Sequence, residues 1–303
     1  MITLEHLTKR YGSHRAVDDV SFDCAPGTVT GFLGPNGAGK STTLRMLTGL
    51  TPPTSGSARI AGHAYRDLRN PGRVVGSMLD AAAQHPGRTG RVTLALAAYA
   101  MGVPTRRVGE LLERVDLTGA ASRRVSQYSL GMRQRLGIAQ ALLGDPHVLV
   151  LDEPANGLDP EGIRWMRGLV RDFADRGGTV LLSSHLLTEV HATVDRLVVI
   201  VDGRIVADGA LADLLRASGV VVRGLDPAVL MTALVEAGLP ARYTGDGAFA
   251  VEGDRVAVGR AAAAAGQVVT ELRDGEATGL EELFFSLTST SVTSTSVSTG
   301  SAA

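Results

Sequence analysis

A glycine-rich segment followed by a lysine and two hydroxyl residues is the part of this sequence best suited to chemistry. It has the pattern G-x-x-x-x-G-K-S and consists of Gly34, Pro35, Asn36, Gly37, Ala38, Gly39, Lys40, Ser41 and Thr42. Glycines let backbone N–H groups curl around a phosphate, and a helix that starts here adds unpaired N–H groups and a positive dipole end. The Lys40 ammonium can reach β- and γ-phosphates, and the Ser41 hydroxyl can ligate Mg²⁺. The segment therefore predicts a site for a nucleoside triphosphate.

Two acids follow an apolar run and form the second chemical feature. The run Val148–Leu151 is typical of a buried parallel strand, and Asp152 and Glu153 come directly after it, at the strand end where α/β sheets bind ligands. Asp152 is placed to bind Mg²⁺ through water, and Glu153 is placed as a base for an attacking water. Acids after strands also commonly cap helices, and Pro154 makes a cap possible here. The phosphate loop upstream favours the metal interpretation.

Four isolated positions could complete such a site. Tyr11 follows the first predicted strand and could stack on a base, although an aromatic near a turn is more often simple packing. Ser129 is a plausible N-cap of a helix that runs to about residue 143. Asp80 ends a strand predicted at 74–79. His185 ends another buried strand and could contact a γ-phosphate, whereas a lone histidine is more often structural.

The elements that must position these residues are those of an α/β domain. Alternating strands at 2–8 and 17–23 precede the phosphate loop and indicate an antiparallel flap beside the nucleotide site. The apolar run 28–33 then supplies the strand and 43–47 the helix that the phosphate-loop pattern requires. The segment from about 85 to 145 has a helical pattern and is interpreted as an insertion. A hairpin is expected around Asp202-Gly203. Residues 1–217 are therefore predicted to form one domain, a P-loop NTPase sheet.

The character of the sequence changes after about residue 218. The predicted order over 218–287 is βαββαβ, which is the order of a small split βαβ domain, followed by an amphipathic helix at 280–287. We find no acid, base or metal constellation in this α+β segment and interpret it as an accessory or interaction domain. Residues 288–303 are almost all serine and threonine and are predicted to be a disordered tail.

Composition limits the classes of function. The chain has 303 residues, of which 44% are hydrophobic and 20% charged, and a net charge of −1, so we expect no nucleic-acid partner. The single cysteine, Cys24, cannot form an internal disulfide and fits a reducing compartment. The first residues lack the pattern of a signal peptide, and no apolar run approaches the ~20 residues that span a bilayer.

The order of the motifs resembles that of the ATPase subunit of an ABC transporter. The resemblance covers about residues 2 to 215 and rests on Tyr11, the phosphate loop, the Ser129-containing segment Tyr128–Arg135, Asp152-Glu153, Asp159 and His185. The segment Tyr128–Arg135 and the C-terminal extension resemble the drug- and antibiotic-exporting branch. Two positions depart from the family pattern. Leu130 stands where the family has glycine, and Asp80 stands where it generally has glutamine.

The resemblance implies specific roles for these residues. Glu153 and His185 would be catalytic, and ATP would contact the phosphate loop, Tyr11 and Asp159. The Mg²⁺ site would consist of Ser41, Asp152 and Asp80. Two copies would form an ATP-dependent head-to-tail homodimer, in which Ser129 and Gly131 of one copy contact the γ-phosphate held by the other.

The resemblance also implies a partner and a location. A separate integral-membrane permease would carry the exported small molecule, and the insertion and the Asp80 region would dock it, so the chain would be peripheral on the cytoplasmic side of the cell membrane. Two other functions remain open. One is a soluble ABC-type ATPase that acts on ribosomes or DNA, and the other is a nucleotide-gated protein that sequesters a drug without transport. A P-loop kinase is disfavoured because Glu153 and the Ser129 segment have no evident use there.

Overall fold

The computed structural model describes residues 1–81, 83–185, 193–216, 219–245 and 247–274. The helix predicted at 280–287 and the tail predicted at 288–303 lie outside these residues. The chain divides into two compact units, Met1–Asp208 and Gly209–Ala303, each with its own hydrophobic core.

A six-stranded, largely parallel sheet is the centre of the first unit. Its strand order is β5-β6-β7-β3-β8-β9, with β3 parallel to both β7 and β8. The strands are β3 (Val29–Leu33), β5 (Val75–Met78), β6 (Val148–Leu151), β7 (Thr179–Ser184), β8 (Arg196–Val201) and β9 (Arg204–Ala210). Every residue of β3, β6 and β7 is buried, which explains why these strands contain no charged residues and are rich in apolar ones. The predicted P-loop NTPase sheet is confirmed.

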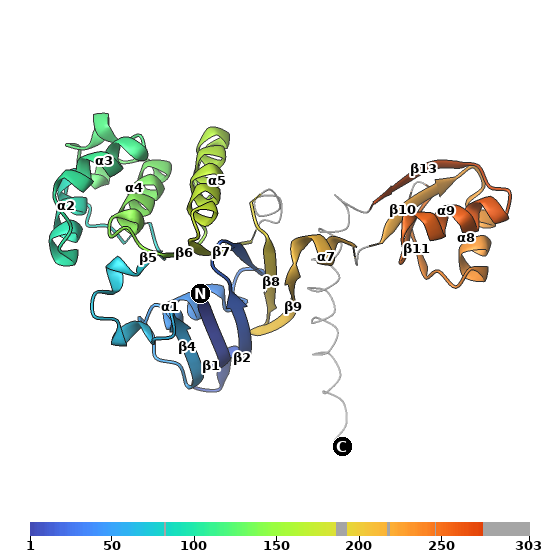
Figure 1. Ribbon diagram of the computed structural model, residues 1–303, viewed down its shortest axis with the longest axis horizontal. Helices are drawn as coiled ribbons and strands as arrows, with labels where there is room; N and C mark the ends of the chain where they lie inside the picture. Colours follow the sequence, from blue (N-terminus) through green and yellow to red (C-terminus); the bar gives the residue numbers. More distant parts are fainter. Residues whose placement is uncertain (82, 186–192, 217–218, 246, 275–303) are drawn as a thin grey trace, which may run out of the picture. The chain divides into compact units, whose positions relative to one another are not determined.

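The faces of this sheet are covered by different elements. One face packs against α1 (Lys40–Leu47) and the antiparallel strands, through a core that includes Phe32, Leu44 and Val150. Helix α5 (Pro160–Asp175) contacts β3 and β7. In Figure 1, α5 lies above the sheet, and α1 lies below it with β1, β2 and β4. The sheet is thus enclosed, which leaves its strand ends as the accessible part.

The predicted flap is a three-stranded antiparallel sheet of order β2-β1-β4. Its strands are β1 (Ile2–Tyr11), β2 (His14–Cys24) and β4 (Ser55–Ile60). Ile2 pairs with Cys24 on one side and with Ile60 on the other, and all three side chains are buried. The flap therefore recruits a strand from beyond the phosphate-loop helix.

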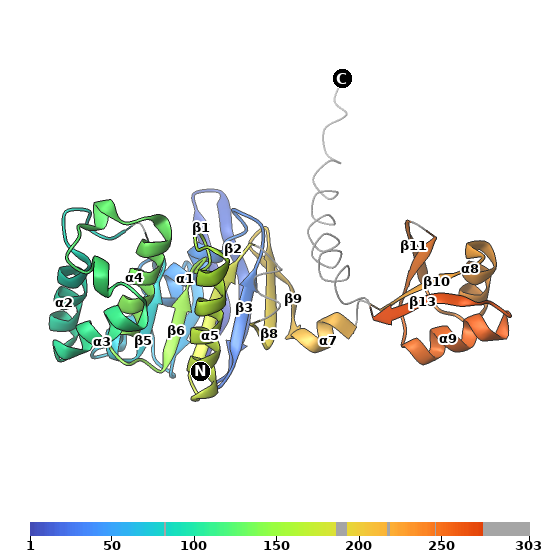
Figure 2. The same cartoon turned by 90° about the horizontal axis from the view of Figure 1, so that it is seen from above.

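Three helices between β5 and β6 form the predicted insertion. They are α2 (Gly90–Met101), α3 (Arg106–Arg114) and α4 (Leu130–Leu142), with short 3₁₀ turns at Thr118–Ala120 and Val125–Gln127. Two further 3₁₀ turns, Tyr65–Asp67 and Pro71–Arg73, precede β5. Both views show the three helices together at the β5 edge of the sheet (Figure 2). Thr89 caps α2 by accepting a hydrogen bond from Val92 N, and Ser129 caps α4 as predicted.

The second unit contains a four-stranded antiparallel sheet of order β11-β12-β10-β13. Its elements are α7 (Leu211–Arg216), β10 (Val220–Gly224), α8 (Pro227–Glu236), β11 (Ala241–Gly245), β12 (Ala248–Val251), α9 (Arg255–Ala264) and β13 (Val269–Asp274). From β10 onward this is the predicted βαββαβ order. Val222, Phe249, Leu234 and Val258 form its core.

Candidate active site

The phosphate loop is held in a conformation that requires glycine at two positions. Gly39 has φ +106, and a Cβ built on it would lie 2.4 Å from the carbonyl oxygen of Ala16. A Cβ on Gly34 would lie 2.3 Å from the carbonyl oxygen of Ile200. In addition, Gly203 N donates a hydrogen bond to Ala38 O at 3.0 Å. The flap and the β8–β9 hairpin thus fix the loop from two sides, between a buried strand and the start of α1.

Lys40 lies inside this loop and is only 6% exposed. Its Nζ donates hydrogen bonds to Gly34 O at 2.6 Å and to Pro35 O at 3.1 Å, and it lies 3.7 Å from Glu153 Oε1. Burial lowers the pKa of Lys40, and the carboxylates of Glu153 and Asp152 oppose that shift by favouring the charged form. The loop therefore contains a cation whose hydrogen bonds to the chain could be exchanged for bonds to phosphate oxygens.

Glu153 joins several of the predicted residues. Its Oε2 lies 2.8 Å from His185 Nδ1, and its Oε1 is the atom that faces Lys40. The backbone of Glu153 has φ 48, in the left-handed region, which costs a non-glycine residue about 1–3 kcal/mol. Such a conformation persists only where surrounding contacts determine it, and it is typical of functional sites. The structure brings Lys40, Asp152, Glu153 and His185 together.

Two residues in this cluster had no role in the sequence analysis. Ser183, at the end of β7, is fully buried; its hydroxyl donates to the Asp152 carboxylate and accepts from Glu153 N at 3.0 Å. Gln134 on α4 is 5% exposed and donates from Nε2 to Glu153 O at 3.4 Å. The sequence signal for Ser183 is a hydroxyl that follows the apolar residues Val180–Leu182 near the carboxyl end of a buried strand. These contacts hold both acids in place.

The predicted metal ligands lie at the same edge of the sheet. Ser41 is exposed on the first turn of α1, Asp152 is half-buried after β6, and Asp80 is exposed just after β5, whose Met78 pairs with Leu151. Within the described residues, no three His, Cys, Asp or Glu side chains gather to hold a metal ion. Mg²⁺ typically takes one or two protein oxygens together with waters and substrate phosphates. The oxygens of Ser41 and Asp152 beside a phosphate loop fit this ion.

Ser129, Gly131 and Asp159 form a separate set. They line a cavity of about 370 Å³ whose lining includes neither Lys40 nor Glu153. Ser129 Oγ accepts from Met132 N at 3.2 Å, and Asp159 caps α5 by accepting from Gly162 N at 2.8 Å. The predicted site residues therefore fall into two places on one chain, the phosphate-loop cluster and this cavity.

Leu130, which stands where the family pattern has glycine, packs against Gly157. A Cβ on Gly157, which has φ +75, would lie 2.3 Å from Leu130 Cδ2, so the leucine side chain covers the glycine. The neighbouring Tyr128 is 3% exposed, and its hydroxyl donates to Ala120 O at 2.8 Å. Burial raises the pKa of Tyr128. The start of α4 is thus anchored on both sides of Ser129.

Tyr11 lies at the end of β1 and is 53% exposed. The Nζ of Lys9 lies 5.1 Å from the centroid of the Tyr11 ring and donates to Pro52 O at 2.7 Å. The exposed ring retains surface on which a base could stack.

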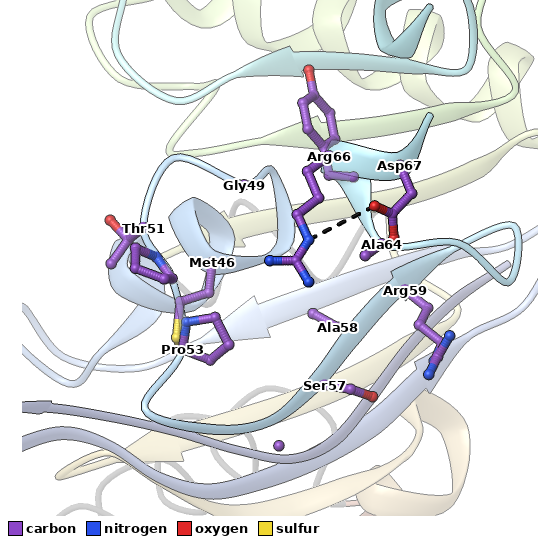
Figure 3. A pocket seen from close by; sticks show the side chains of 13 residues that line it. Met46, Gly49, Thr51, Pro53, Ser57, Ala58, Arg59, Ala64, Arg66 and Asp67 are labelled. Atoms are coloured by element: carbon purple, nitrogen blue, oxygen red, sulfur yellow. Dashed lines mark ion pairs between the residues drawn. The ribbon is translucent and has the colours of Figure 1, made fainter. Parts of the chain in front are cut away.

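A second cavity, of about 330 Å³, lies where α1 ends and β4 begins. Figure 3 shows Arg66 directed into it, 3.7 Å from the Asp67 carboxylate, above Met46, Pro53 and Ala58. Its lining contains none of the predicted site residues. The candidate active site is therefore identified by the phosphate loop and the acids, and not by this cavity.

A phosphate loop between a buried parallel strand and a helix, facing acids at the ends of adjacent strands, defines a P-loop nucleotide-binding protein. Residues 17–156 match the family model described as ABC transporter. The chain is 41% identical to the bacitracin transport ATP-binding protein BcrA of Bacillus licheniformis, over 69% of each chain. It is 39% identical to the daunorubicin resistance ATP-binding protein DrrA3 of Streptomyces coeruleorubidus, over 72% of this chain and 71% of that protein. The chain belongs to the ATP-binding subunits of ABC transporters.

Solved structures agree with this assignment. An ATP-binding subunit of an ABC transporter, 30% identical, superposes with a TM-score of 0.65 and covers 71% of this chain and 92% of that one. A dimeric bacterial ABC transporter cassette, 25% identical, has a TM-score of 0.64 over 70% of this chain and 99% of that one. Among the helices that the structure describes, none has the length and hydrophobicity needed to cross a bilayer.

Proposed function

We propose that this chain hydrolyses ATP to power the export of a small molecule, such as a drug, an antibiotic or a lipid-like compound, through a separate membrane permease. The observation that supports hydrolysis is the position of Glu153, which is hydrogen-bonded to His185 and faces the buried Lys40 at the phosphate loop. The class of cargo is supported by relatives named for bacitracin transport and daunorubicin resistance.

The residues divide the chemistry among them. Lys40 and the loop N–H groups neutralise and orient the phosphates, and Mg²⁺, held through Ser41 and Asp152, supplies further charge when bound. The Glu153 carboxylate accepts a proton from the attacking water, while His185, at 2.8 Å, orients that carboxylate and can reach the γ-phosphate. Asp80 follows β5, the strand paired with β6, and its carboxylate would add negative charge near the Mg²⁺ site. Tyr11 supplies the ring on which the adenine stacks.

A homodimer completes the site in this proposal. The N-terminus of α4, with Ser129 and Gly131, opens on a cavity apart from Lys40 in the same chain. A helix N-terminus is suited to bind an anion, so we place it against the γ-phosphate held by a second copy. Asp159 lies in the same cavity, between the two copies. The dimeric cassette structure supports this arrangement.

The permease is the proposed membrane partner, with this chain peripheral on the cytoplasmic side. Helix α2 exposes Val92, Leu96 and Tyr99, which are spaced along one face, and Tyr99 is 88% exposed. Together with the region around Asp80, this apolar stripe is the surface that we propose docks the permease. The second unit is proposed as an accessory domain, and we propose no nucleic-acid partner.

The test is reconstitution with a candidate permease. The chain and the permease are co-purified, inserted in vesicles and assayed for ATP-dependent movement of a drug, with Glu153→Gln as the inactive variant. The exposed Glu161, in the first turn of α5, supplies the matched control Glu161→Gln. Drug movement that requires ATP and Glu153 supports export. ATP-dependent drug binding by the chain alone, with no movement, would favour sequestration. ATPase activity that responds to ribosomes or DNA and not to the permease would favour a soluble ATPase.

A further inference from the structure

Arg135 joins three elements around the Ser129 cavity. It lies on α4, and its Nη1 donates to Val115 O, at the end of α3, at 3.2 Å. Its guanidinium carbon lies 4.7 Å from the centroid of the Trp165 ring on α5. The carboxylate of Asp116 is 3.9 Å away, and the arginine side chain is 18% exposed. Arg135 also lines the cavity that contains Ser129. One side chain thus connects α3, α4 and α5 beside this surface.

The contacts are of a kind to which arginine is better suited than lysine. A planar guanidinium can stack on an aromatic ring while its edge donates hydrogen bonds, whereas an ammonium is a point charge on a flexible stem. The guanidinium here lies over the Trp165 ring and donates to Val115 O at the same time. Replacement by lysine would keep the charge and lose the planar group that lies over Trp165, because an ammonium is a point charge.

The position of Arg135 connects it to the residues proposed to meet the partner's phosphate. Gly131 and Arg135 are four residues apart on α4 and therefore lie on one face of the helix. A Cβ on Gly131 would lie 2.9 Å from Gly157 O, so the helix start is packed closely on the loop that leads to α5. An α4 that tilted relative to α5 would displace Ser129 and Gly131 from Asp159, the cap of α5.

We propose that Arg135 is a positioning residue, which fixes the N-terminus of α4 against α5 through Trp165 so that Ser129 and Gly131 meet the γ-phosphate bound by a second copy. This inference rests on the shared site proposed above. It predicts that Arg135 affects ATP-driven association of two chains and leaves nucleotide binding at the phosphate loop of a single chain unchanged.

The experiment uses the full chain with Glu153→Gln, which should bind ATP and hydrolyse it slowly. ATP binding is measured on the monomer with a fluorescent ATP analogue, and dimer formation is followed by size-exclusion chromatography as ATP and protein concentrations are varied. Arg135→Lys should weaken the ATP-dependent dimer about tenfold, the loss expected from a stacked cation and one hydrogen bond, with the monomer's nucleotide affinity unchanged. Arg164→Lys, at an exposed position of α5, is the matched control and should change neither.

Variants of Trp165 test the same contact from α5. Trp165→Phe keeps a ring for the guanidinium and should retain the dimer, whereas Trp165→Leu should weaken it as Arg135→Lys does. The double variant Arg135→Lys with Trp165→Leu should form a dimer no weaker than that of Arg135→Lys alone, because the lysine has already lost the contact with the ring that Trp165→Leu removes. Should Arg135→Lys fail to fold, the comparison of Trp165→Phe with Trp165→Leu decides the question. Trp165 is the single tryptophan, so Arg135→Lys should also change the intrinsic fluorescence.

The outcomes separate this inference from the proposed function. If Glu153→Gln alone forms no ATP-dependent dimer, with the permease present or absent, the shared site itself is refuted. If it dimerises and Arg135→Lys dimerises at the same ATP and protein concentrations, the positioning role is overturned while the shared site stands. Equal weakening of the dimer and of the monomer's nucleotide binding would also overturn the role, because it would indicate a general loss of structure.

Discussion

Glu153→Gln changes one atom in the cluster and tests the assignment of the base. The amide keeps the shape of the side chain and can still bond to His185 Nδ1, now 2.8 Å from Oε2. It cannot accept a proton from water, and removal of a positioned general base typically lowers the rate by about 10²–10⁴. That loss corresponds to an increase in the activation barrier of about 2.7–5.4 kcal/mol. ATP binding should persist, since Lys40, Ser41 and Asp152 are unchanged.

The effect on folding should be much smaller. The ion pair of Glu153 with Lys40 has an N···O distance of 3.7 Å, with side chains 20% and 6% exposed, respectively. At an effective dielectric constant of 20, its attraction is about 4 kcal/mol. Neutralising the glutamate also removes the cost of keeping that carboxylate from water, which opposes the loss. Lys40 loses this partner but keeps its hydrogen bonds to Gly34 O and Pro35 O, so we expect the free energy of unfolding to fall by about 1–2 kcal/mol.

Phosphate release and size-exclusion chromatography test both parts of this prediction. The variant should turn over slowly and accumulate as an ATP-bound dimer, while the control Glu161→Gln should behave as the wild type. Turnover at the wild-type rate would remove Glu153 as the base. Slow turnover without a dimer would leave the base in place and count against the shared site, once the measurement has been repeated with the permease present.

Three further predictions concern the residues around this base and the flap. Lys40→Met should abolish nucleotide binding or turnover and leave the thermal unfolding curve close to that of the wild type; normal turnover would refute the phosphate-loop assignment. Ser183→Ala should lower turnover roughly 10–100-fold, because the Ser183 hydroxyl bonds to both the Asp152 carboxylate and the Glu153 N–H. Loss of a residue that orients metal ligands typically has an effect of this size. Unchanged turnover at limiting Mg²⁺ would contradict the prediction. Cys24 is fully buried, and burial raises its pKa to about 12, so at pH 8 a thiol reagent should modify it only after unfolding; rapid modification of the folded chain would contradict the pairing of β1 with β2.

Local pattern was sufficient for most of the fold. The buried strand β6 is an uninterrupted apolar run, and the βαββαβ order of the second unit follows from its alternating turns and periodicities. The first strand was predicted to end at residue 8, whereas β1 continues to Tyr11. His6 has φ 50, and the register with β2 shifts between Leu4 and Leu7 and again near Lys9. Such irregularities break the alternation on which a strand prediction depends, although pairing continues.

The contacts that organise the site were not visible in the sequence. The phosphate loop and the acids follow a local pattern, so their residues could be identified directly. Ser183 and Glu153 are 30 positions apart, and Arg135 contacts Val115 across 20 positions. No spacing rule links such residues, because the sheet order and the packing of α4 on α5 bring them together. The sequence thus identifies the residues proposed to react, such as Lys40 and Glu153, whereas the structure is needed to identify the residues that position them, such as Ser183.

The hydrogen bonds of Lys40 have a consequence for how ATP would promote dimerisation. Its Nζ already bonds to Gly34 O and Pro35 O and faces Glu153. A phosphate that binds this lysine therefore exchanges existing bonds, so the net gain at Lys40 is smaller than the new contacts alone suggest. Additional favourable free energy must come from donors that are not already used within the loop. The Ser129 hydroxyl and the first N–H groups of α4 are donors of this kind, but they lie in a different cavity of the same chain. In the proposed homodimer, a second copy supplies them to the phosphate, and this is why the occupied phosphate loop should favour association more strongly than the empty one.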